Sequence, residues 1–322
     1  MPDRIVIAGA SGFIGQYLAD AFRTQGADVK LIGRSGPDAA WGNTAAITDL
    51  LDGSDLLINL AGKSVNCRYG PDSRAEIMRS RVETTRELAT ALEACAAPPR
   101  LWINSSTATI YRHAEDRPMT EATGEIGTGF SVGIATAWEN ELNASAVKTR
   151  KVALRMAIVL GDGSALIPLL RLARFGLGGP QVDGPWFRTR ARVAAGTFHE
   201  FRARRGLQKF SWIHIADVLG IIEFLRQHDE LEGPVNASAP HPVDNVTLMR
   251  IIRKALRVPF GLPAPRALLE LGTAIIRSET ELVLKSRWVV PEKLLAAGYV
   301  FEYPDLAPAI EQIVDARTIR RR

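Results

Sequence analysis

A glycine-rich stretch near the start of the chain, GASGFIG, places glycines at Gly9, Gly12 and Gly15. It follows the apolar run RIVIA and precedes GQYLADAFRTQG, which has the pattern of an amphipathic helix. In that context the first glycine permits a tight turn, the second lets backbone approach a pyrophosphate, and the third lets the helix pack closely against the strand. The helix N-terminus offers unpaired N–H groups and a positive dipole end. The pattern therefore predicts a dinucleotide site, and the other interpretation is a glycine-rich turn without a ligand.

Strand-like runs and helical patterns alternate along the first half of the chain. DVKLI and DLLINL are typical of buried strands, and a helical pattern runs from about Asp72 to Ala96 before Pro98 and Pro99. RLWINSS and RKVALRMAIVL predict a fourth and a fifth strand. This alternation predicts an α/β fold with a Rossmann-type doubly wound parallel sheet and helices on both faces.

Beyond Gly161 the pattern is less regular. FSWIHI predicts a further strand and DVLGIIEFLRQH a helix, and short helical stretches alternate with prolines from Pro240 onward. We therefore expect two lobes that are interleaved in sequence. The nucleotide-binding lobe comprises 1–162 with 209–238, and a smaller C-terminal substrate-binding lobe comprises 163–208 with 239–322.

The basic character of the chain is confined to two places. Its net charge is +5 and its pI about 9.4, but the excess comes from the tail RTIRRR and from 181–209, which holds seven Lys or Arg against two acidic residues. A nucleic-acid binder spreads such charge along one face, so we expect no nucleic-acid partner. A small molecule is the expected ligand.

Targeting signals are missing from the sequence. No stretch approaches the roughly 20 apolar residues that span a bilayer, and the N-terminus lacks the pattern of a secretory signal. Only Cys67 and Cys95 are present, too few for a disulfide framework. We therefore expect a cytoplasmic protein without a membrane partner. Its oligomeric state is open, with a homodimer as one option.

Several motifs resemble those of the extended short-chain dehydrogenase/reductase superfamily. The glycine spacing is GxxGxxG, INLAG resembles the superfamily's third-strand loop, and SSTATIY resembles its stretch after the fourth strand. AWENE, LRMAIVLGDGSAL, GLGGP, FSWIHIADV, GPVNASAPHPVDN and PEKLLAAGYVFEYPDLAPAI resemble an atypical, epimerase-like branch with its own C-terminal segment. The resemblance implies the fold and an NAD(P) cofactor, and it leaves the reaction open.

The end of the second strand indicates which cofactor is used. A cofactor with a free ribose 2′-hydroxyl favours an acidic residue there, but LIGRS offers Arg34 and Ser35. Because Arg34 can pair with a 2′-phosphate, we expect NADP(H). The other interpretation of Arg34 is an exposed arginine. With the resemblance, the expected cofactor-binding residues are Gly9, Ser11, Gly12, Phe13, Ile14, Gly15, Arg34, Ser35, Leu60, Ala61, Gly62, Ser105 and Arg155, with no metal ligand.

The superfamily's acid/base pair, Tyr-x-x-x-Lys, is absent. Counting back from Glu139, its two places fall near Ser131 and Ala135, and neither side chain can replace a phenol or a lysine. The atypical branch itself tends to lack the pair. General acid–base help is worth roughly 10²–10⁴ in rate, so an enzyme here would need another group.

Three residues are candidates for the catalytic role. Thr107 falls where the superfamily has its catalytic Ser or Thr, Tyr111 follows in the same loop, and His199 lies further along the chain. His214 is a fourth candidate, although a histidine in an apolar strand is more often structural. Glu139, beside Trp138, either binds cofactor or anchors its helix.

The stretch between GLGGP and WIH is longer than in the resembling branch, and it is basic. Arg188, Arg190 and Arg192 alternate with other residues at period two, which predicts a strand. With AAG as a turn and TFHEFRAR as the returning strand, we expect a hairpin at about 181–209. It is either a solvated surface hairpin or a lid that presents arginines to an anionic substrate and brings His199 to the site.

These patterns predict an NADP(H)-dependent oxidoreductase or epimerase that acts on a small hydroxyl or carbonyl substrate, with an anionic one favoured by the arginines. The alternative is an NADP(H)-binding regulatory or scaffold protein with little turnover, which the missing pair favours. The sequence leaves open the substrate and the choice between net redox and epimerisation.

Overall fold

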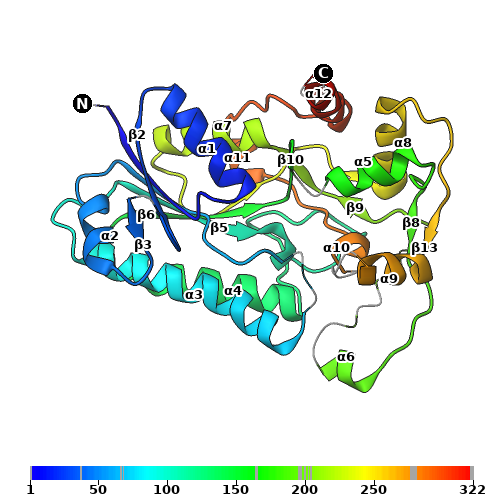
Figure 1. The fold of residues 1–322 in the computed structure, drawn as a ribbon, viewed down its shortest axis with the longest axis horizontal. Coiled ribbons are helices and arrows are strands. Elements are labelled where there is room, and N and C mark those ends of the chain that lie inside the picture. The colour runs from blue at the N-terminus through cyan, green and yellow to red at the C-terminus, as the bar shows by residue number, and fades with distance from the viewer. Residues whose placement is uncertain are drawn as a thin grey trace.

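The computed structural model describes residues 2–36, 38–65, 67, 69–163, 166–194, 198, 201, 203, 205–275 and 281–319. Its centre is a parallel sheet with the strand order β11-β6-β5-β4-β1-β2-β3 (Figure 1). Its strands are β1 (Arg4–Ala8), β2 (Asp28–Gly33), β3 (Ala39–Ala40), β4 (Leu56–Asn59), β5 (Leu101–Thr107), β6 (Arg150–Met156) and β11 (Gly233–Ala237). This confirms the predicted Rossmann-type doubly wound fold.

Helices cover both faces of the sheet (Figure 1). One face carries α1 (Phe13–Thr24) and α7 (Ile215–Gln227), and the other carries α2 (Thr44–Leu51), α3 (Pro71–Glu93) and α4 (Phe130–Ala144). Successive strand residues point to opposite faces, so Ile5 and Ile7 belong to the first apolar cluster and Val6 to the second. All three side chains are fully buried. An apolar strand buried on both faces explains why RIVIA has no polar alternation.

The predicted fifth strand is broken at Ala157. Its N–H still donates to the Ala237 carbonyl of β11 at 2.9 Å, but β6 ends at Met156. The chain then continues as β7 (Ile158–Leu160), which leaves the main sheet and pairs with β10 (Trp212–His214). A single strand over 150–160 is therefore wrong.

The remaining elements surround a third apolar cluster, to which Leu170, Trp212, Ile252 and Ile310 contribute. Those that contribute to this cluster are β9 (Lys209–Phe210) paired with β12 (Val243–Asp244), and the helices α5 (Leu166–Arg174), α8 (Asn245–Ala255) and α12 (Leu306–Ile319). Beside them lie β8 (Gln181–Val182) paired with β13 (Ala264–Pro265), and the helices α9 (Arg266–Ile275) and α10 (Glu281–Leu284). Between α10 and α12, α11 (Glu292–Ala296) returns to the first face of the main sheet, where Leu294 is fully buried.

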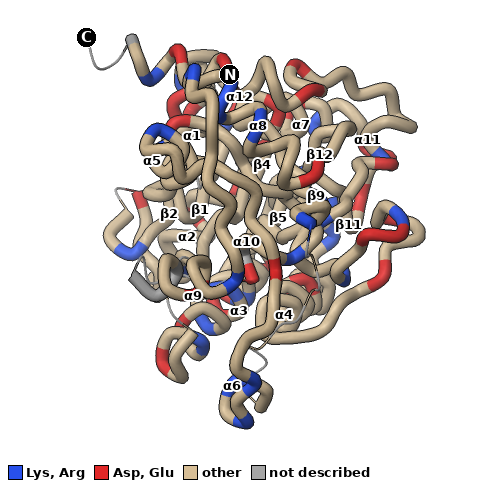
Figure 2. Tube along the Cα trace, turned by 90° about the vertical axis from the view of Figure 1, so that its right-hand side faces the viewer, with Lys and Arg blue, Asp and Glu red and all other residues tan. Residues whose placement is uncertain are grey.

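The basic insertion differs from the predicted hairpin. Where a first strand was expected, the chain forms the short helix α6 (Arg190–Ala194). The Thr189 hydroxyl accepts a hydrogen bond from the Arg192 N–H at 3.3 Å, as a helix cap does. Figure 2 shows α6 at the edge of the molecule, carrying Lys or Arg. Most of the expected returning strand, including His199, lies outside the described residues.

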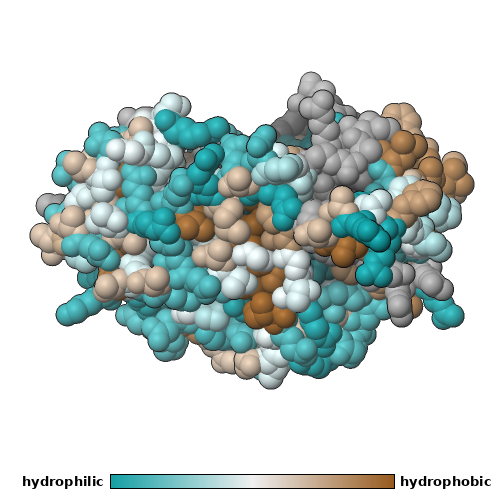
Figure 3. All heavy atoms as spheres, turned by 90° about the horizontal axis from the view of Figure 1, so that it is seen from below, coloured by the Kyte–Doolittle hydropathy of each residue, from teal (hydrophilic) through white to brown (hydrophobic). Residues whose placement is uncertain are grey.

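One end of the molecule exposes apolar side chains. Figure 3 shows hydrophobic residues gathered at the end where α5, α8 and β13 lie in Figure 1. Phe175, Phe260 and Leu262 are 82%, 63% and 60% exposed. Among the helices of the described ranges, none is long and apolar enough to cross a bilayer.

Candidate functional site

The three positions of the first loop are glycine for different structural reasons. Gly9 has φ +81°, and a Cβ there would lie 2.7 Å from the Ala61 backbone nitrogen. A Cβ on Gly15 would lie 2.6 Å from the Ala10 Cα, so the helix packs against the loop rather than against the strand itself. The protein's own packing therefore requires both glycines.

Gly12 is different. Among the described residues, a Cβ built on Gly12 meets only the Gly9 carbonyl, at 3.8 Å. Its φ of −81° is open to any residue. Nothing in the described chain requires a glycine here, so the bare backbone leaves room for a ligand outside the protein's own atoms.

The N-terminus of α1 is available to an anion. Gly12 is its N-cap, and within the described chain no side chain caps the first turn, which also contains no acidic residue. Ser11 is exposed, whereas Phe13 and Ile14 are half-buried. The glycine at 161 leaves space for the Phe13 ring, because a Cβ there would lie 2.6 Å from its Cζ. The N–H groups of this turn suit a phosphate.

The loop after β4 lies against the glycine loop. Leu60 is half-buried, Ala61 is buried and Gly62 is exposed. The Asn59 side chain accepts a hydrogen bond from the Ala61 N–H at 3.0 Å, and the Leu60 N–H donates to the Ala8 carbonyl at 2.8 Å. The structure thus brings two of the predicted cofactor-binding stretches together at the carboxyl edge of the sheet.

Cations gather near the end of β2. Arg34 and Ser35 are exposed. The pKa of Glu76 is lowered by its hydrogen bond to Lys63, and the charges of Arg79 and Arg34 lower it further. These three cations therefore lie within electrostatic range of one carboxylate. Lys63 and Arg79 were not predicted as site residues, although Lys63 directly follows the INLAG motif.

The end of β5 carries the predicted hydroxyl residues. Ser105 is 8% exposed. The Thr107 hydroxyl accepts a hydrogen bond from the Thr109 N–H at 3.1 Å and so begins the 3-10 turn η1 (Ala108–Ile110). Next to it, the Ser106 hydroxyl donates to Glu139 at 2.5 Å.

Tyr111 and Arg155 belong to a buried network. The Tyr111 hydroxyl donates to Asn236 Oδ1 at 2.9 Å and accepts from Arg155 Nη1 at 2.8 Å. Arg155 also donates to both oxygens of Glu139, at 2.8 and 2.7 Å. Burial raises the pKa of Tyr111, which is 1% exposed, while Arg155 is 7% exposed. These bonds engage the Tyr111 hydroxyl and the Arg155 guanidinium within the protein and link Glu139, on α4, to β6.

Ser131 and Ala135, the positions expected for the acid/base pair, both contact other parts of the protein. The Ser131 hydroxyl donates to Glu281 Oε2 at 2.9 Å. Ala135 is fully buried in an apolar cluster with Tyr111 and Val289. A lysine at position 135 would have to bury its charge in that cluster.

The C-terminal segment after α10 lies against the loop that follows β5. Lys285 Nζ donates to the Thr109 carbonyl at 2.8 Å, and Arg287 Nε donates to the Thr109 hydroxyl at 3.1 Å. Glu281, Lys285 and Arg287 are 6%, 4% and 6% exposed. Burial, followed by the charge of Arg287, lowers the pKa of Lys285 to about 8, while Glu281 opposes this.

His113 lies beside the same segment. Its Nδ1 accepts a hydrogen bond from the Ser286 N–H at 2.9 Å. Burial, followed by the charge of Lys285, lowers the pKa of His113 to about 4, so the imidazole is neutral at pH 7. Sequence reasoning missed His113, Lys285 and Arg287. The signal for Lys285 and Arg287 was two cations within the largely apolar stretch ELVLKSRWVV, and His113 had no comparable signal.

The basic insertion contacts this region at Phe201. The Phe201 ring stacks on His113, with ring centroids 5.0 Å apart and an interplanar angle of 14°. Its N–H donates to Asp183 at 2.9 Å, and Asp183 also accepts from Arg266 at 2.7 Å. Arg192 pairs with Glu270 at 3.5 Å.

His214 has a structural role. Its Nδ1 accepts from the Ala216 N–H at 3.3 Å at the start of α7, and its ring lies 4.0 Å from that of Tyr303. It is 4% exposed.

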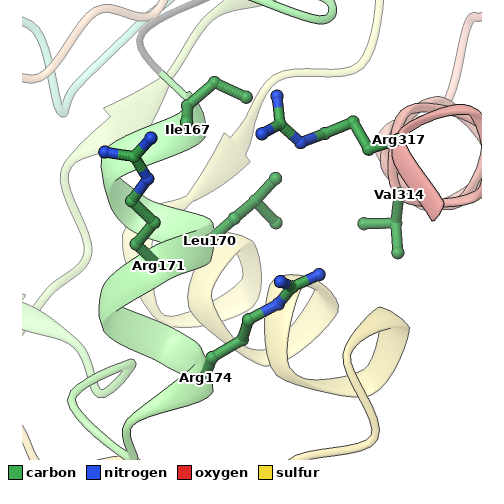
Figure 4. A pocket seen from close by; sticks show the side chains of 6 residues that line it. All are labelled: Ile167, Leu170, Arg171, Arg174, Val314 and Arg317. Carbon is green, nitrogen blue, oxygen red and sulfur yellow. The ribbon is translucent and has the colours of Figure 1, made fainter. Parts of the chain in front are cut away.

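A small cavity lies elsewhere, between α5 and α12. Figure 4 shows its lining side chains. They are Ile167, Leu170, Arg171, Arg174, Val314 and Arg317. None of them is among the predicted site residues.

Known families match nearly the whole chain. The NAD dependent epimerase/dehydratase family matches residues 5–237, and a domain of unknown function, DUF1731, matches residues 264–313. The chain is 30% identical over 318 residues to the epimerase family protein SDR39U1 of Bos taurus, covering 97% of this chain and 99% of that protein. It is 27% identical over 326 residues to the epimerase family protein YfhF of Bacillus subtilis, with coverage of 98% and 99%.

Solved structures agree. The human epimerase family protein SDR39U1 (isoform 2), solved with NADPH, matches with a TM-score of 0.82 and 28% identity over 97% of this chain and 99% of that one. A nucleoside-diphosphate sugar epimerase from Corynebacterium glutamicum matches with a TM-score of 0.69 and 25% identity over 98% of this chain and 58% of that one. These matches confirm the resemblance drawn from the motifs. The chain belongs to the NAD-dependent epimerase/dehydratase family.

Proposed function

We propose that this protein is an NADP(H)-dependent oxidoreductase or epimerase that acts on a small, anionic hydroxyl or carbonyl compound. The cofactor assignment is supported by the room left at Gly12, by the cations Arg34 and Lys63 near the end of β2, and by the human relative solved with NADPH. When bound, NADP(H) supplies or accepts a hydride.

The chain's own residues would hold the cofactor at the carboxyl edge of the sheet. The N–H groups at the start of α1 would bind the pyrophosphate, with Gly12 leaving space for it. Arg34 and Lys63 would bind the 2′-phosphate through charge-assisted hydrogen bonds. Ala61 and its neighbours would support the cofactor from the loop after β4.

The observation that carries the substrate class is the charge buried beside Thr109. Lys285 and Arg287 are both more than nine-tenths buried, as is the carboxylate of Glu281 at the start of the same described segment. The positive charges of two buried side chains are thus concentrated beside one buried carboxylate in a poorly solvated place. A bound carboxylate or phosphate would offset this charge, because an opposite charge stabilises the buried ionised form.

The test compares matched substrates. Oxidation of NADPH is followed with a panel of 2-oxo carboxylates and with the primary amide of each. We expect kcat/KM to be at least tenfold higher for the carboxylates, and Arg287→Met to remove most of that preference. Equal consumption of acid and amide would contradict the anionic substrate. Epimerisation, which regenerates the cofactor, is detected by the change in product stereochemistry.

A second candidate is an NADP(H)-binding regulatory or scaffold protein with little turnover. The occupied hydroxyl of Tyr111 and the missing Tyr-x-x-x-Lys pair favour it. It predicts tight NADPH binding with no turnover of any panel member.

The oligomeric state stays a prediction. A homodimer would cover the exposed apolar end, where Phe175 and Phe260 lie. Analytical ultracentrifugation of the protein and of Phe260→Ser tests it, because a dimer that uses this end should dissociate in the variant.

A further inference from the structure

The geometry points to Lys285 as the group that donates and removes the proton at the substrate oxygen, with Glu281 and Ser131 positioning the segment that carries it. This inference rests on the proposed function and deepens it, because it names the residue that takes over the role of the absent tyrosine.

Lys285 lies at the edge of the sheet where ligands bind. Its Nζ donates to the carbonyl of Thr109, in the 3-10 turn that directly follows β5. In doubly wound parallel sheets the ligand occupies the crevice outside the carboxyl ends of the strands. The β1 and β4 loops, which hold the glycine motif and INLAG, lie at this same edge because β1, β4 and β5 are parallel neighbours.

The ammonium group of Lys285 can make more hydrogen bonds than the described residues provide. Its three protons can each make one, and within the described ranges the structure gives Lys285 Nζ a single hydrogen-bond partner. The residue is 4% exposed, so bulk water does not readily supply the others. A buried donor in this state is stabilised by an oxygen acceptor from a ligand.

The segment is held in place from two sides. At its start, the hydroxyl of Ser131 on α4 binds Glu281 on α10. Further along, the Ser286 hydroxyl donates to the Ala114 carbonyl at 2.6 Å, and the Ser286 N–H donates to His113. These contacts fix the backbone on both sides of Lys285, which suits a group that must meet a substrate in one orientation.

The surrounding charges favour a lysine that can lose its proton near neutral pH. Arg287, two residues further on, repels the ammonium form, and Glu281 attracts it. His113, from the loop after β5, is neutral at pH 7, and Asp183 acts on His113 from β8 and its following turn. With burial as the largest cause, the pKa of Lys285 is lowered to about 8. A group with a pKa near the working pH is an effective general acid and base.

The proton balance is simple. On reduction, NADPH would supply the hydride for the carbonyl carbon, and the oxygen that gains the C=O π pair would take a proton from Lys285 Nζ. The product is an alcohol, and the neutral amine regains a proton from water. In the reverse direction the neutral amine removes the hydroxyl proton as hydride leaves the carbon.

The first experiment measures the pKa of Lys285 and does not depend on turnover. The full protein is labelled with ¹³C-lysine, the Lys285 Cε signal is assigned with Lys285→Arg, and its pH titration is followed by NMR with and without NADPH. We expect a midpoint near pH 8, and a lower midpoint in Glu281→Gln because an attracting carboxylate is lost. Lys293 is the matched control, since its Nζ also donates to a backbone carbonyl, that of Glu232, at 2.7 Å, but at the surface. A midpoint for Lys285 at the ordinary lysine value of about 10.4 would overturn the inference.

The second experiment uses a substrate found in the panel. Lys285→Met should lower kcat at least a hundredfold and remove the ionisation near pH 8 from the pH profile, while NADPH affinity changes less than twofold. Lys285→Arg should be equally slow, because arginine keeps the charge but does not release a proton. Lys293→Arg should match the unchanged protein.

The outcomes separate the two proposals. Wild-type turnover in Lys285→Met, or full activity in Lys285→Arg, would overturn the role of Lys285 and leave the proposed function intact. Failure of the unchanged protein to bind NADPH or to use any panel member would instead contradict the proposed function.

Discussion

The Ser131 hydroxyl donates a hydrogen bond of 2.9 Å to Glu281, a residue 150 positions further along the chain. Ser131 lies near the position expected for the acid/base tyrosine. Glu281 begins the segment that contains the buried side chains of Lys285 and Arg287. The contact therefore joins α4 to a charged C-terminal segment at the position where the acid/base tyrosine was expected.

Arg34 is expected to select the phosphorylated cofactor. Arg34→Ala should weaken NADPH binding by roughly 1.5–3 kcal/mol, the worth of a charge-assisted hydrogen bond, and leave NADH nearly unchanged. Fluorescence titration with both cofactors measures this. Arg23→Ala, at the end of α1, is the control. Equal weakening of both cofactors would mean that Arg34 does not contact the 2′-phosphate.

Gly12 and Gly15 should respond differently to substitution by a residue with a side chain. Gly12→Val should abolish NADPH binding while the free energy of unfolding changes by no more than about 1 kcal/mol, because its side chain enters open space. Gly15→Ala should cost about 1–3 kcal/mol of stability, because its Cβ would lie 2.6 Å from the Ala10 Cα. Urea unfolding and cofactor titration distinguish these effects. Normal NADPH binding by Gly12→Val would mean that the glycine motif is a turn that does not bind the cofactor.

Tyr111 should prove structural. Tyr111→Phe removes the partner of Arg155 and Asn236, so we expect a loss of about 1–3 kcal/mol in the free energy of unfolding. Turnover per folded molecule should fall less than tenfold. The control is Tyr17→Phe, on α1. If Tyr111→Phe folds normally and is inactive, the phenol is the proton donor after all.

His113 should make stability depend on pH. Its pKa in the folded protein is about 4, below the unfolded value of 6.5. The unfolded chain therefore binds a proton first, and stability present above pH 6.5 is lost as the pH falls toward 4. With about 1.36 kcal/mol per unit, the loss amounts to at most about 3 kcal/mol. Urea unfolding of the protein and of His113→Asn across this range measures it.

The exposed histidine at position 241 provides the comparison. His241→Asn should leave the pH dependence unchanged, because that side chain lies at the surface beside Asp305. If His113→Asn retains the full slope of the unchanged protein, buried carboxylates rather than His113 cause the acid sensitivity.

The sequence predicted those parts of the fold that depend on local patterns. RIVIA, GASGFIG and the following helix are contiguous in sequence. Their hydrophobic periodicity and glycine spacing were therefore sufficient to predict the strand, the loop and the helix. Period two did not suffice at Arg188 to Arg192, because a Thr189 cap and helix-forming Arg and Ala residues favour a short helix there. The break at Ala157 goes with the pairing of β7 to β10, a strand far along the chain, which no local pattern encodes.

The catalytic part of the site could not be predicted for the same reason. Lys285 meets Thr109 across 176 positions, and its burial depends on how α10 folds back onto α4. Tyr111 was in the predicted loop, but whether its hydroxyl is free depends on Asn236 and Arg155 from two other strands. His199 lies outside the described residues, so its catalytic role stays a prediction.

The cofactor is the claim on which the rest of the account depends, and direct titration of the unchanged protein with NADPH and with NADH tests it most directly. We predict saturable binding of NADPH that is at least tenfold tighter than that of NADH, because Arg34 and Ser35 rather than an acidic residue directly follow β2. Tighter binding of NADH, or no binding of either, would contradict the account.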